Sequence, residues 1–249
     1  MVQKLTGKNP KDKGPRHPEP FGARHSERSE ESRDPSAAAR PQDDRRRYGK
    51  TVIGLTGGFG SGKTTAAHFF EELGAFVLDS DMLAHEALMK GSPTYEKVLA
   101  LFKGKDIAGP GGDLDRKKIA GLVFRDPARR KKLEAVIHPY VFERIAEEIG
   151  DAAEDIAVVE IPLLFETGFE MFCHHTVVVK TPDAVTAGRL KEKGFSAEEI
   201  AARREAQLSL EEKLKQADII IDNSGTFQET RREVEKVWKK LHPVSKGAV

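Results

Sequence analysis

Short apolar runs alternate with longer segments of helical periodicity from Lys50 onward. This alternation is typical of βα units, which build a parallel sheet covered by helices. The runs that we expect to form strands are Thr51–Thr56, Phe76–Leu78, Ile156–Ile161, Thr176–Lys180 and Ile219–Asp222. The predicted fold class is therefore α/β, with a five-stranded parallel sheet flanked by helices.

Two helical segments interrupt this alternation. Residues 82–150 show helical patterns and no strand of their own, and residues 183–214 form a second helical segment that is rich in charge. We expect the first to be a helical substrate domain inserted into the sheet. The core that carries them is predicted to comprise residues 49–81, 151–182 and 215–242.

Two helix-start signals support this division. Asp126 is an N-cap residue, and Pro127 after it suits the first helical position because that position needs no backbone N–H. Ser196, with Glu199 three residues later, matches a capping box. Each signal predicts that a helix begins at that point.

The two ends of the chain differ from the rest in composition. Phe21 is the only large apolar side chain between Leu5 and Tyr48. So little apolar surface cannot offset the entropy lost on ordering, and we expect residues 1–48 to be a disordered extension. Residues 243–249 are expected to be a flexible tail.

Composition excludes several classes of protein. The 41 basic and 40 acidic residues nearly cancel, which disfavours a nucleic-acid-binding protein even though Arg45–Arg47 form a local basic run. The single cysteine, Cys173, excludes an internal disulfide and a cysteine-based zinc site. No apolar run reaches the ~18 residues of a membrane span, and no signal peptide is visible. We expect a cytoplasmic protein without nucleic-acid or membrane partners; the oligomeric state is left open, with a monomer favoured.

The first predicted strand leads directly into a phosphate-binding motif. Residues 57–64, Gly-Gly-Phe-Gly-Ser-Gly-Lys-Thr, match the pattern G-x-x-x-x-G-K-[ST] in full, between a strand and a helix. Glycines let backbone N–H groups approach a polyphosphate, and the helix N-terminus adds a favourable dipole. The residues predicted to bind nucleotide are Gly57, Gly58, Gly60, Ser61, Gly62, Lys63, Thr64 and Thr65.

Two side chains of this motif have predicted chemical roles. Lys63 would bridge the β- and γ-phosphates of ATP, and the Thr64 hydroxyl would ligate Mg²⁺. The alternative is a glycine-rich turn that happens to precede a helix, but the complete pattern and its context both favour a P-loop. ATP and Mg²⁺ are therefore the predicted substrate and cofactor.

Carboxylates at the end of the second predicted strand narrow the function. Asp79 and Asp81 lie at the carboxyl edge of the sheet, where ligands of parallel sheets bind. One of them can accept a proton from an attacking hydroxyl or hold that hydroxyl in line, as phosphoryl transfer requires. The alternative for Asp81 is a helix cap. No guanine-reading Asn-Lys-x-Asp sequence occurs, so a GTPase is disfavoured.

Several motifs taken together carry a family resemblance. Leu55–Thr64 and Asp79–Asp81 resemble the corresponding motifs of the dephospho-coenzyme A kinase family. Further segments resemble that family in order, over about residues 51–240: Gly91–Pro93, Leu114–Arg116, Val123–Pro127, Leu133–Pro139, Pro162–Glu166 and Ile221–Gly225. The resemblance implies ATP-dependent phosphorylation of the ribose 3′-hydroxyl of dephospho-CoA to give CoA and ADP, the final step of CoA biosynthesis.

The resemblance also implies roles for individual residues. Asp81, Lys63 and Arg189 would be catalytic, with Asp81 orienting or deprotonating the 3′-hydroxyl. The residues that would bind dephospho-CoA, with Asp81, are Arg116, His138, Pro162, Leu163 and Leu164. His138 precedes Pro139, so a helix-end residue is the alternative for it.

The resemblance also implies that residues 183–214 form a mobile lid whose arginines meet the phosphates of ATP. Arg189 and Lys193 are four residues apart, as are Arg203 and Gln207, so we expect each pair to share a helix face that closes over ATP. The family usually has arginine at position 193, and lysine keeps its charge but loses the bidentate fork. A solvated charged face is the alternative for these side chains.

Three further points remain open at this level. Glu160 could hold a magnesium-bound water or pair with a nearby base. Phe59 stands where the family commonly has isoleucine, which leaves the backbone of the loop unchanged. The competing functions are another P-loop nucleoside or nucleotide kinase and, from a different class, a non-catalytic ATP-binding regulatory module.

Overall fold

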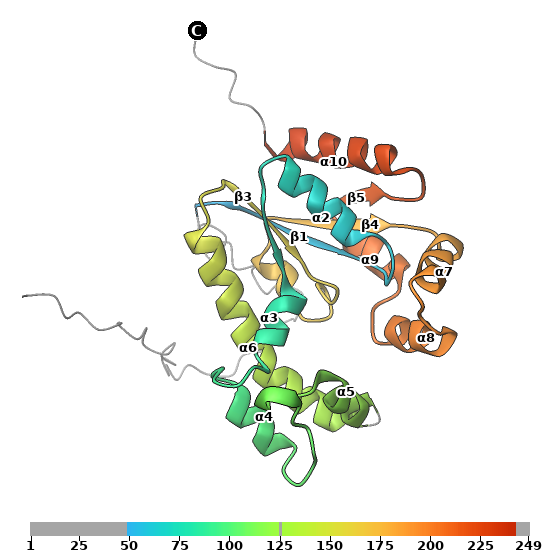
Figure 1. The fold of residues 1–249 in the computed structure, drawn as a ribbon. Coiled ribbons are helices and arrows are strands. Elements are labelled where there is room, and N and C mark those ends of the chain that lie inside the picture. The colour runs from blue at the N-terminus through green and yellow to red at the C-terminus, as the bar shows by residue number, and fades with distance from the viewer. Residues whose placement is uncertain (1–48, 125, 243–249) are drawn as a thin grey trace, which may run out of the picture. The chain divides into compact units, whose positions relative to one another are not determined.

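The computed structural model describes residues 49–124 and 126–242, and its centre is a parallel sheet (Figure 1). The strand order is β2-β3-β1-β4-β5, and all neighbours are parallel. The strands are β1 (Thr51–Gly57), β2 (Phe76–Asp79), β3 (Ile156–Glu160), β4 (His175–Lys180) and β5 (Ile219–Asp222). The five-stranded sheet and each of its predicted strands are confirmed, with ends that differ by at most one residue. The expectations for residues 1–48 and 243–249 lie outside the described residues.

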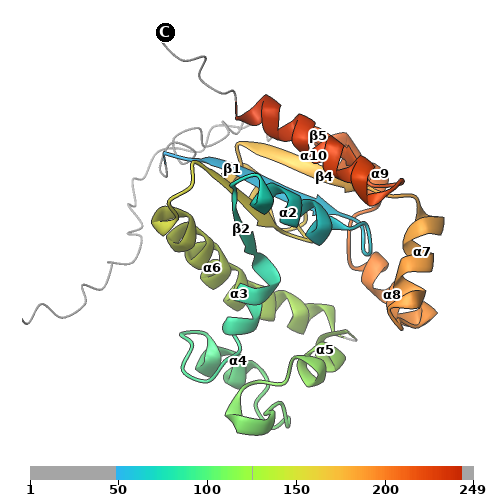
Figure 2. The same ribbon diagram turned by 45° about the horizontal axis from the view of Figure 1, so that its top comes forward.

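Apolar side chains on the two faces of the sheet form two separate core layers. Ile53 and Leu55 of β1 face one side of the sheet, where they pack with Phe70 of α2 (Lys63–Glu72) and Val234 of α10 (Phe227–Leu241). Val52 faces the other side, because successive side chains of a strand point to opposite faces. Figure 2 shows α2 and α10 side by side over the first face.

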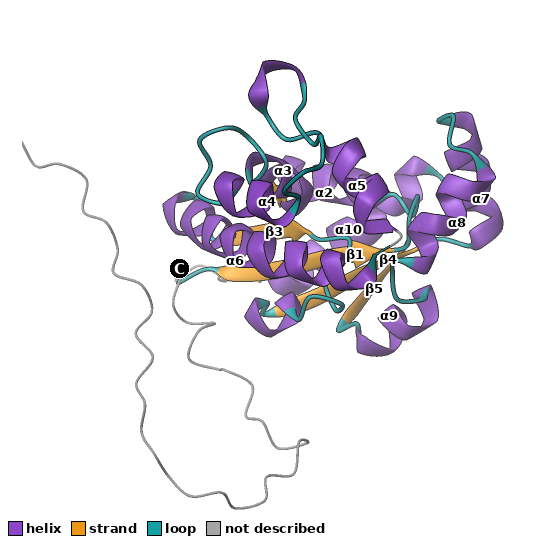
Figure 3. Ribbon diagram, turned by 90° about the horizontal axis from the view of Figure 1, so that it is seen from below, coloured by secondary structure: helices purple, strands orange, loops and turns teal. Residues whose placement is uncertain are grey.

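The opposite face is covered by helices from three parts of the chain. Val141, Ile145 and Ile149 of α6 (Pro127–Asp151) pack against this face. The short 3₁₀ helix η3 (Phe169–Phe172) and α9 (Leu210–Gln216) complete the layer. Figure 3 shows α6 and α9 over the strands from this side.

Residues between β2 and β3 form helices with a small core of their own. These elements are α3 (Ser80–Glu86), α4 (Tyr95–Leu101), the 3₁₀ helix η2 (Pro110–Gly112), α5 (Arg116–Phe124) and α6. The buried side chains of this small core, from the helices and the loops between them, are Leu88, Val98, Phe102, Ile107, Leu114 and Ile119. An isolated antiparallel bridge joins Ala108 and Leu114, so the segment is helical apart from one β-bridge among the described residues.

The start of α6 agrees with the sequence, but its course does not. The Asp126 side chain accepts a hydrogen bond from the Arg129 backbone N–H at 2.9 Å, and Pro127 follows as the first helical residue. The helix then continues through Pro139 to Asp151, so the alternative of His138 as a helix-end residue is wrong. Packing of α6 against the sheet compensates for the backbone N–H that Pro139 lacks.

Three helices lie between β4 and β5. They are α7 (Asp183–Glu192), α8 (Ala197–Glu205) and α9, and Ser196 and Glu199 form the predicted capping box at the start of α8. The expectation that Arg203 and Gln207 share one helix face is wrong, because α8 ends at Glu205 and a turn carries Gln207. Lys193 is the C-cap residue of α7.

In the part of the chain that the structure describes, no helix has both the length and the apolar character that crossing a membrane requires.

The N-cap of α6 gives a first testable prediction. Asp126→Ala is expected to lower the free energy of unfolding by about 1 kcal/mol, because the first turn of the helix loses its side-chain acceptor. Asp126→Asn keeps a side-chain oxygen that can accept the same hydrogen bond, so its free energy of unfolding should fall clearly less than that of Asp126→Ala. Urea denaturation of the two variants and the wild type measures both values; equal losses would show that charge, including the pairing with Arg129, matters more than capping.

Candidate active site

The loop between β1 and α2 needs glycine at two of its turns. Gly60 has φ 80° and Gly62 has φ 86°, a conformation that side-chain-bearing residues rarely adopt. A Cβ on Gly62 would lie 2.1 Å from the Asn223 amide nitrogen, and one on Gly60 would lie 2.8 Å from the Leu190 side chain. These glycines therefore give the loop its curvature and let the ends of β5 and α7 approach it.

A hydrogen-bond network from β4 and β5 fixes the loop from behind. The Ser61 carbonyl accepts from the Asn223 amide at 2.7 Å and from the Thr181 hydroxyl at 2.9 Å. Thr230 of α10 donates to the Asn223 carbonyl side-chain oxygen at 2.5 Å. Sequence reasoning assigned no role to Thr181 or Thr230, since only the sheet order brings them beside the loop.

Charged side chains are buried at the base of this loop. The Lys63 ammonium donates to the carbonyls of Gly57 and Gly58 at 3.3 and 3.4 Å. Burial lowers the pKa of Lys63, and the negative charge of Glu160 opposes this shift. The P-loop lysine is thus held against the loop by weak contacts that a phosphate can replace.

Thr64 and Glu160 place two hard oxygen groups together. The Thr64 hydroxyl donates to the Glu160 carboxylate at 3.1 Å, and Glu160 is 8% exposed at the end of β3. Burial raises the pKa of Glu160, while the Lys63 charge and the Thr64 hydrogen bond act in the opposite direction. A carboxylate in this setting favours a nearby cation.

Asp79 and Asp81 have different surroundings. The Asp79 carboxylate caps α3 by accepting from the Asp81 backbone N–H at 2.8 Å. The capping role considered for Asp81 therefore belongs to Asp79. The limited hydration of the Asp81 carboxyl raises its pKa, and the Asp79 charge adds to this effect; Arg116 opposes it.

A cavity of about 1070 Å³ extends from the loop towards α5, α7 and α8. Gly60, Gly62, Lys63, Thr64 and Thr65 line it, whereas Gly57, Gly58 and Ser61 do not. Its remaining polar and charged lining residues are Asp81, Arg116, Glu160, Arg189, Glu192, Lys193, Arg203, Gln207 and Asn223. The cavity thus joins a phosphate-binding loop to cations from two helical segments.

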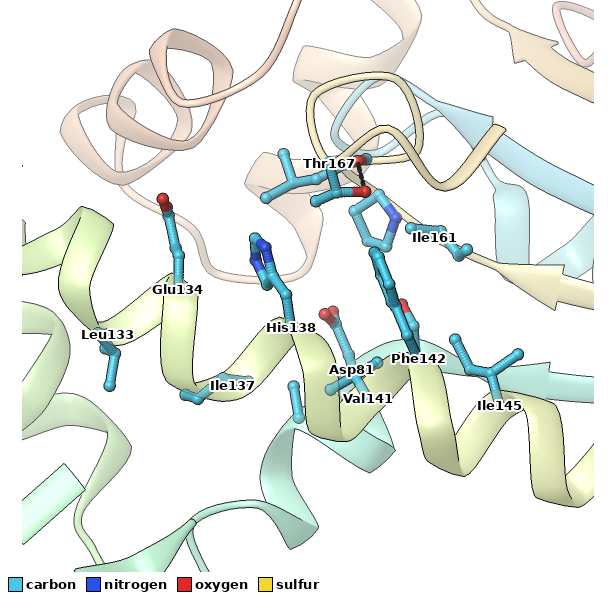
Figure 4. A pocket seen from close by; sticks show the side chains of 14 residues that line it. Asp81, Leu133, Glu134, Ile137, His138, Val141, Phe142, Ile145, Ile161 and Thr167 are labelled. Carbon is cyan, nitrogen blue, oxygen red and sulfur yellow. Dashed lines mark hydrogen bonds between the residues drawn. The ribbon is translucent and has the colours of Figure 1, made fainter. Parts of the chain in front are cut away.

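A smaller cavity of about 170 Å³ lies between α3, α6 and the segment after β3. Figure 4 shows Glu134 and His138 projecting from α6, with Asp81 reaching the same space from α3. Its walls are mainly apolar side chains such as Ile137 and Phe142. The ring of His138 stacks on that of Phe142, with centroids 6.2 Å apart, and burial lowers the pKa of His138.

Three residues line both cavities: Asp81, Pro162 and Leu163. Leu164, expected to bind substrate with Pro162 and Leu163, is instead 0% exposed and packs in the core beneath the turn. Its side chain lies so close to Gly54 that an added Cβ would meet it at 2.9 Å. The expectation of direct substrate contact is therefore corrected for Leu164, which supports the turn from below.

Residues of α7 and α8 approach the loop from the other side. The Arg189 guanidinium donates to the Asn223 backbone carbonyl at 3.2 Å. The Arg203 guanidinium lies 4.8 Å from the centroid of the Phe59 ring and 4.6 Å from that of Phe195. The sequence did not indicate this cation–π cluster, because its members come from a loop, a turn and a helix that are distant along the chain.

Comparisons with known proteins agree with this arrangement. The family model for dephospho-CoA kinase matches residues 51–229. The chain belongs to the dephospho-CoA kinase family. Dephospho-CoA kinase from Aquifex aeolicus is 42% identical over 190 residues, which cover 76% of this chain and 96% of that protein. A dephospho-CoA kinase from Bacillus cereus is 38% identical over 194 residues, 76% of this chain and 96% of that protein.

Solved structures support membership of the dephospho-CoA kinase family. A crystal structure of a Thermus thermophilus protein has 39% sequence identity and a TM-score of 0.68, and the match covers 77% of this chain and 98% of that one. Dephospho-CoA kinase from Campylobacter jejuni has 30% identity and a TM-score of 0.58, with 77% and 97% coverage. The α/β fold and the P-loop kinase architecture of this chain are therefore those of the dephospho-CoA kinases.

Gly62 gives the prediction for this site. Gly62→Ala is expected to lower the free energy of unfolding by about 1–3 kcal/mol, because the backbone strain of φ 86° adds to the clash with Asn223. It should also weaken ATP binding, since the loop must shift to relieve the clash. Calorimetry with ATP and urea denaturation measure the two effects.

The matched control is Gly58→Ala. A Cβ at Gly58 meets no atom within 4 Å, and its φ is not positive, so the unfolding free energy should stay close to that of the wild type. If Gly62→Ala were as stable as Gly58→Ala, the close packing of the loop against Asn223 would not be a constraint.

Proposed function

We propose that this chain transfers the γ-phosphoryl group of ATP to the ribose 3′-hydroxyl of dephospho-CoA, giving CoA and ADP. The observation that carries the proposal is the position of Asp81, which lines both the larger cavity beside the P-loop and the smaller cavity beside α6. A carboxylate at such a junction can reach an acceptor hydroxyl in one cavity and face the phosphoryl donor in the other.

ATP occupies the larger cavity in this proposal. Backbone N–H groups of residues 57–64 and the N-terminus of α2 bind its phosphates. Lys63 approaches the β- and γ-phosphates, and Arg189 stabilises charge on the transferring group. Gly60, Gly62 and Lys63 line the cavity and face the nucleotide directly. Gly57, Gly58 and Ser61 do not line it, and their carbonyls shape the loop by accepting hydrogen bonds from Lys63 and Asn223.

Mg²⁺ fits the pair formed by Thr64 and Glu160. Hard oxygen ligands suit this ion, which usually combines one or two protein groups with substrate phosphates. Among residues 49–124 and 126–242, no group of three or more His, Cys, Asp and Glu side chains could hold a metal ion. Mg²⁺ would neutralise charge on the phosphates; Thr64 would ligate it and Glu160 would hold a water bound to it.

Dephospho-CoA places its pantetheine end in or near the smaller cavity. The mainly apolar wall of α6 suits the methyl and methylene groups of pantetheine, and His138 offers a contact for one of its polar groups. Arg116 lines the larger cavity and lowers the pKa of Asp81 by its charge, so it lies close enough to bind an anionic group of the acceptor. Pro162 and Leu163 line both cavities, so they lie where the two substrates meet.

The transfer step moves one proton and one phosphoryl group. The 3′-oxygen forms a bond to the γ-phosphorus as the bond to the β,γ-bridging oxygen breaks, and the hydroxyl proton passes to Asp81. Because the transition state is loose, alignment and charge neutralisation contribute more than strong base catalysis. Asp81 therefore acts by orienting the hydroxyl as well as by accepting its proton.

Residues 82–150 serve as the acceptor domain and residues 183–214 as the lid. Within the lid segment, α7 and α8 are the mobile part, because Arg189, Lys193 and Arg203 line the cavity while α9 packs against β4. Closure over both substrates would exclude water from the γ-phosphoryl group. One chain forms both cavities, so a monomer is sufficient for the reaction, and we place it in the cytoplasm, where we expect this protein.

ADP release from ATP and Mg²⁺, with and without dephospho-CoA, tests the proposal. Adenosine and AMP are the control acceptors, and Lys63→Ala is the inactive control because it removes the phosphate-binding ammonium. Strong stimulation by dephospho-CoA alone, with CoA as product, is the expected result. Stimulation by AMP or adenosine would point to another nucleoside or nucleotide kinase, and ATP binding without any acceptor dependence would point to a regulatory module.

Asp81 gives a prediction on turnover. Asp81→Asn should lower kcat by about 10²-fold or more, since the amide cannot accept the proton, while ATP affinity stays close to that of the wild type. Steady-state kinetics and ATP titration measure the two effects. Turnover like that of the wild type would show that Asp81 is not the base.

The pH profile gives an independent check. Because its surroundings raise the pKa of Asp81, the carboxyl stays protonated to a higher pH than an ordinary aspartate. Only the ionised form can accept the proton, so kcat/KM should fall as the pH decreases through this raised pKa. The residual activity of Asp81→Asn should lack that acidic limb; an unchanged limb would assign it to another group.

A further inference from the structure

Lys213 is a fully buried cation that the reaction scheme above does not use. It lies in α9, and its side chain is 0% exposed. Taking an ammonium group out of water is costly unless it is paired and hydrogen-bonded. The groups that bind the Lys213 ammonium therefore account for its burial.

The partners of Lys213 lie on the segment after β3. Its ammonium donates to the Pro162 carbonyl at 2.6 Å and forms an ion pair with the Glu166 carboxylate at 2.9 Å. The same Glu166 oxygen accepts from the Leu208 backbone N–H at 2.7 Å. Burial lowers the pKa of Lys213, and Glu166 opposes this shift.

A third element joins the network at the same carbonyl. The Thr56 hydroxyl donates to the Pro162 oxygen at 3.3 Å, and Thr56 immediately precedes the P-loop at the end of β1. The Pro162 carbonyl therefore connects the P-loop strand with α9. Leu208, held by Glu166, follows Gln207 of the large cavity and precedes α9, so the network also fixes the connection from α8.

This network surrounds the turn that both cavities share. Pro162 and Leu163 line the larger and the smaller cavity, and Asp81 lines both as well. A displacement of this turn would change the lining of the smaller cavity and of the adjoining end of the larger cavity. In an enzyme that works mainly by alignment, a shift of about 1 Å can lower the rate by about 10²-fold.

We propose that Lys213 is a positioning residue for phosphoryl transfer, which fixes the Pro162–Leu163 turn between the two substrates, with Glu166 as its counterion. This inference rests on the proposed function. It assigns Lys213 no contact with substrate, and its effect on the reaction passes through the backbone of Pro162.

The physical chemistry of buried ion pairs distinguishes this role from simple stabilisation. Replacing both partners of such a pair by groups of similar size is often neutral or stabilising, whereas removing one partner leaves a buried charge. Lys213→Met alone should therefore lower stability and activity together. The double variant Lys213→Met/Glu166→Gln should regain stability, because no unpaired charge remains and the glutamine oxygen can still accept from Leu208.

The experiment measures kcat, the KM for dephospho-CoA and the dissociation constant for ATP. Both variants are expected to lose at least about tenfold in kcat/KM for dephospho-CoA, because each lacks the donor that holds Pro162. ATP affinity should change by less than about threefold, because Lys63 and Thr64 hydrogen-bond to the loop and to Glu160 and not to members of this network. Circular dichroism and thermal unfolding compare the folded states.

The matched control is Val237→Ala. Val237 is buried in α10 on the opposite face of the sheet, away from both described cavities, so this variant should lose stability while its kinetic constants stay unchanged. If the double variant folds and turns over like the wild type, Lys213 is a structural residue only and the inference is wrong. If wild-type protein releases no ADP in response to dephospho-CoA, the proposed function fails first, and that result needs no variant.

Discussion

The parallel register of the sheet is the constraint on which the site depends. Because all strands run in one direction, their carboxyl ends meet at one edge. Asp79 lies opposite Glu160, and Gly57 lies opposite Val179, two residues before Thr181. The P-loop, the carboxylates and the side chains that hold the loop are therefore neighbours, although more than 100 residues separate some of them.

Two side chains of opposite charge, Lys63 and Glu160, are buried at this edge of the sheet. Burial lowers the pKa of Lys63 and raises that of Glu160, and each side chain opposes the shift of the other. Weak contacts of Lys63 with two carbonyls and the pairing of Glu160 with Thr64 satisfy them in part. The negative charge of a polyphosphate would complement the Lys63 ammonium, which is consistent with ATP as the substrate.

The helix α6 couples the smaller cavity to the core. One stretch of it, with Ile145 and Ile149, packs against the sheet, and an earlier stretch carries Glu134 and His138 into the smaller cavity. A helix that passes through Pro139 without ending keeps these two functions on one rigid element. The cavity beside Asp81 is thus positioned by the same apolar contacts that stabilise the fold.

The sequence by itself determined the five strands, the P-loop, the N-cap at Asp126 and the capping box at Ser196, because each depends on local periodicity or on a few adjacent residues. It also placed Asp81 at the carboxyl edge of the sheet. It could not place Leu164 in the core, keep His138 inside a helix or separate Gln207 from α8, since packing across elements overrides local propensity. Only the tertiary structure decided that Asp81 lies between two cavities and that Lys213 bonds to a carbonyl 51 residues away, because these contacts form when distant segments pack around the sheet.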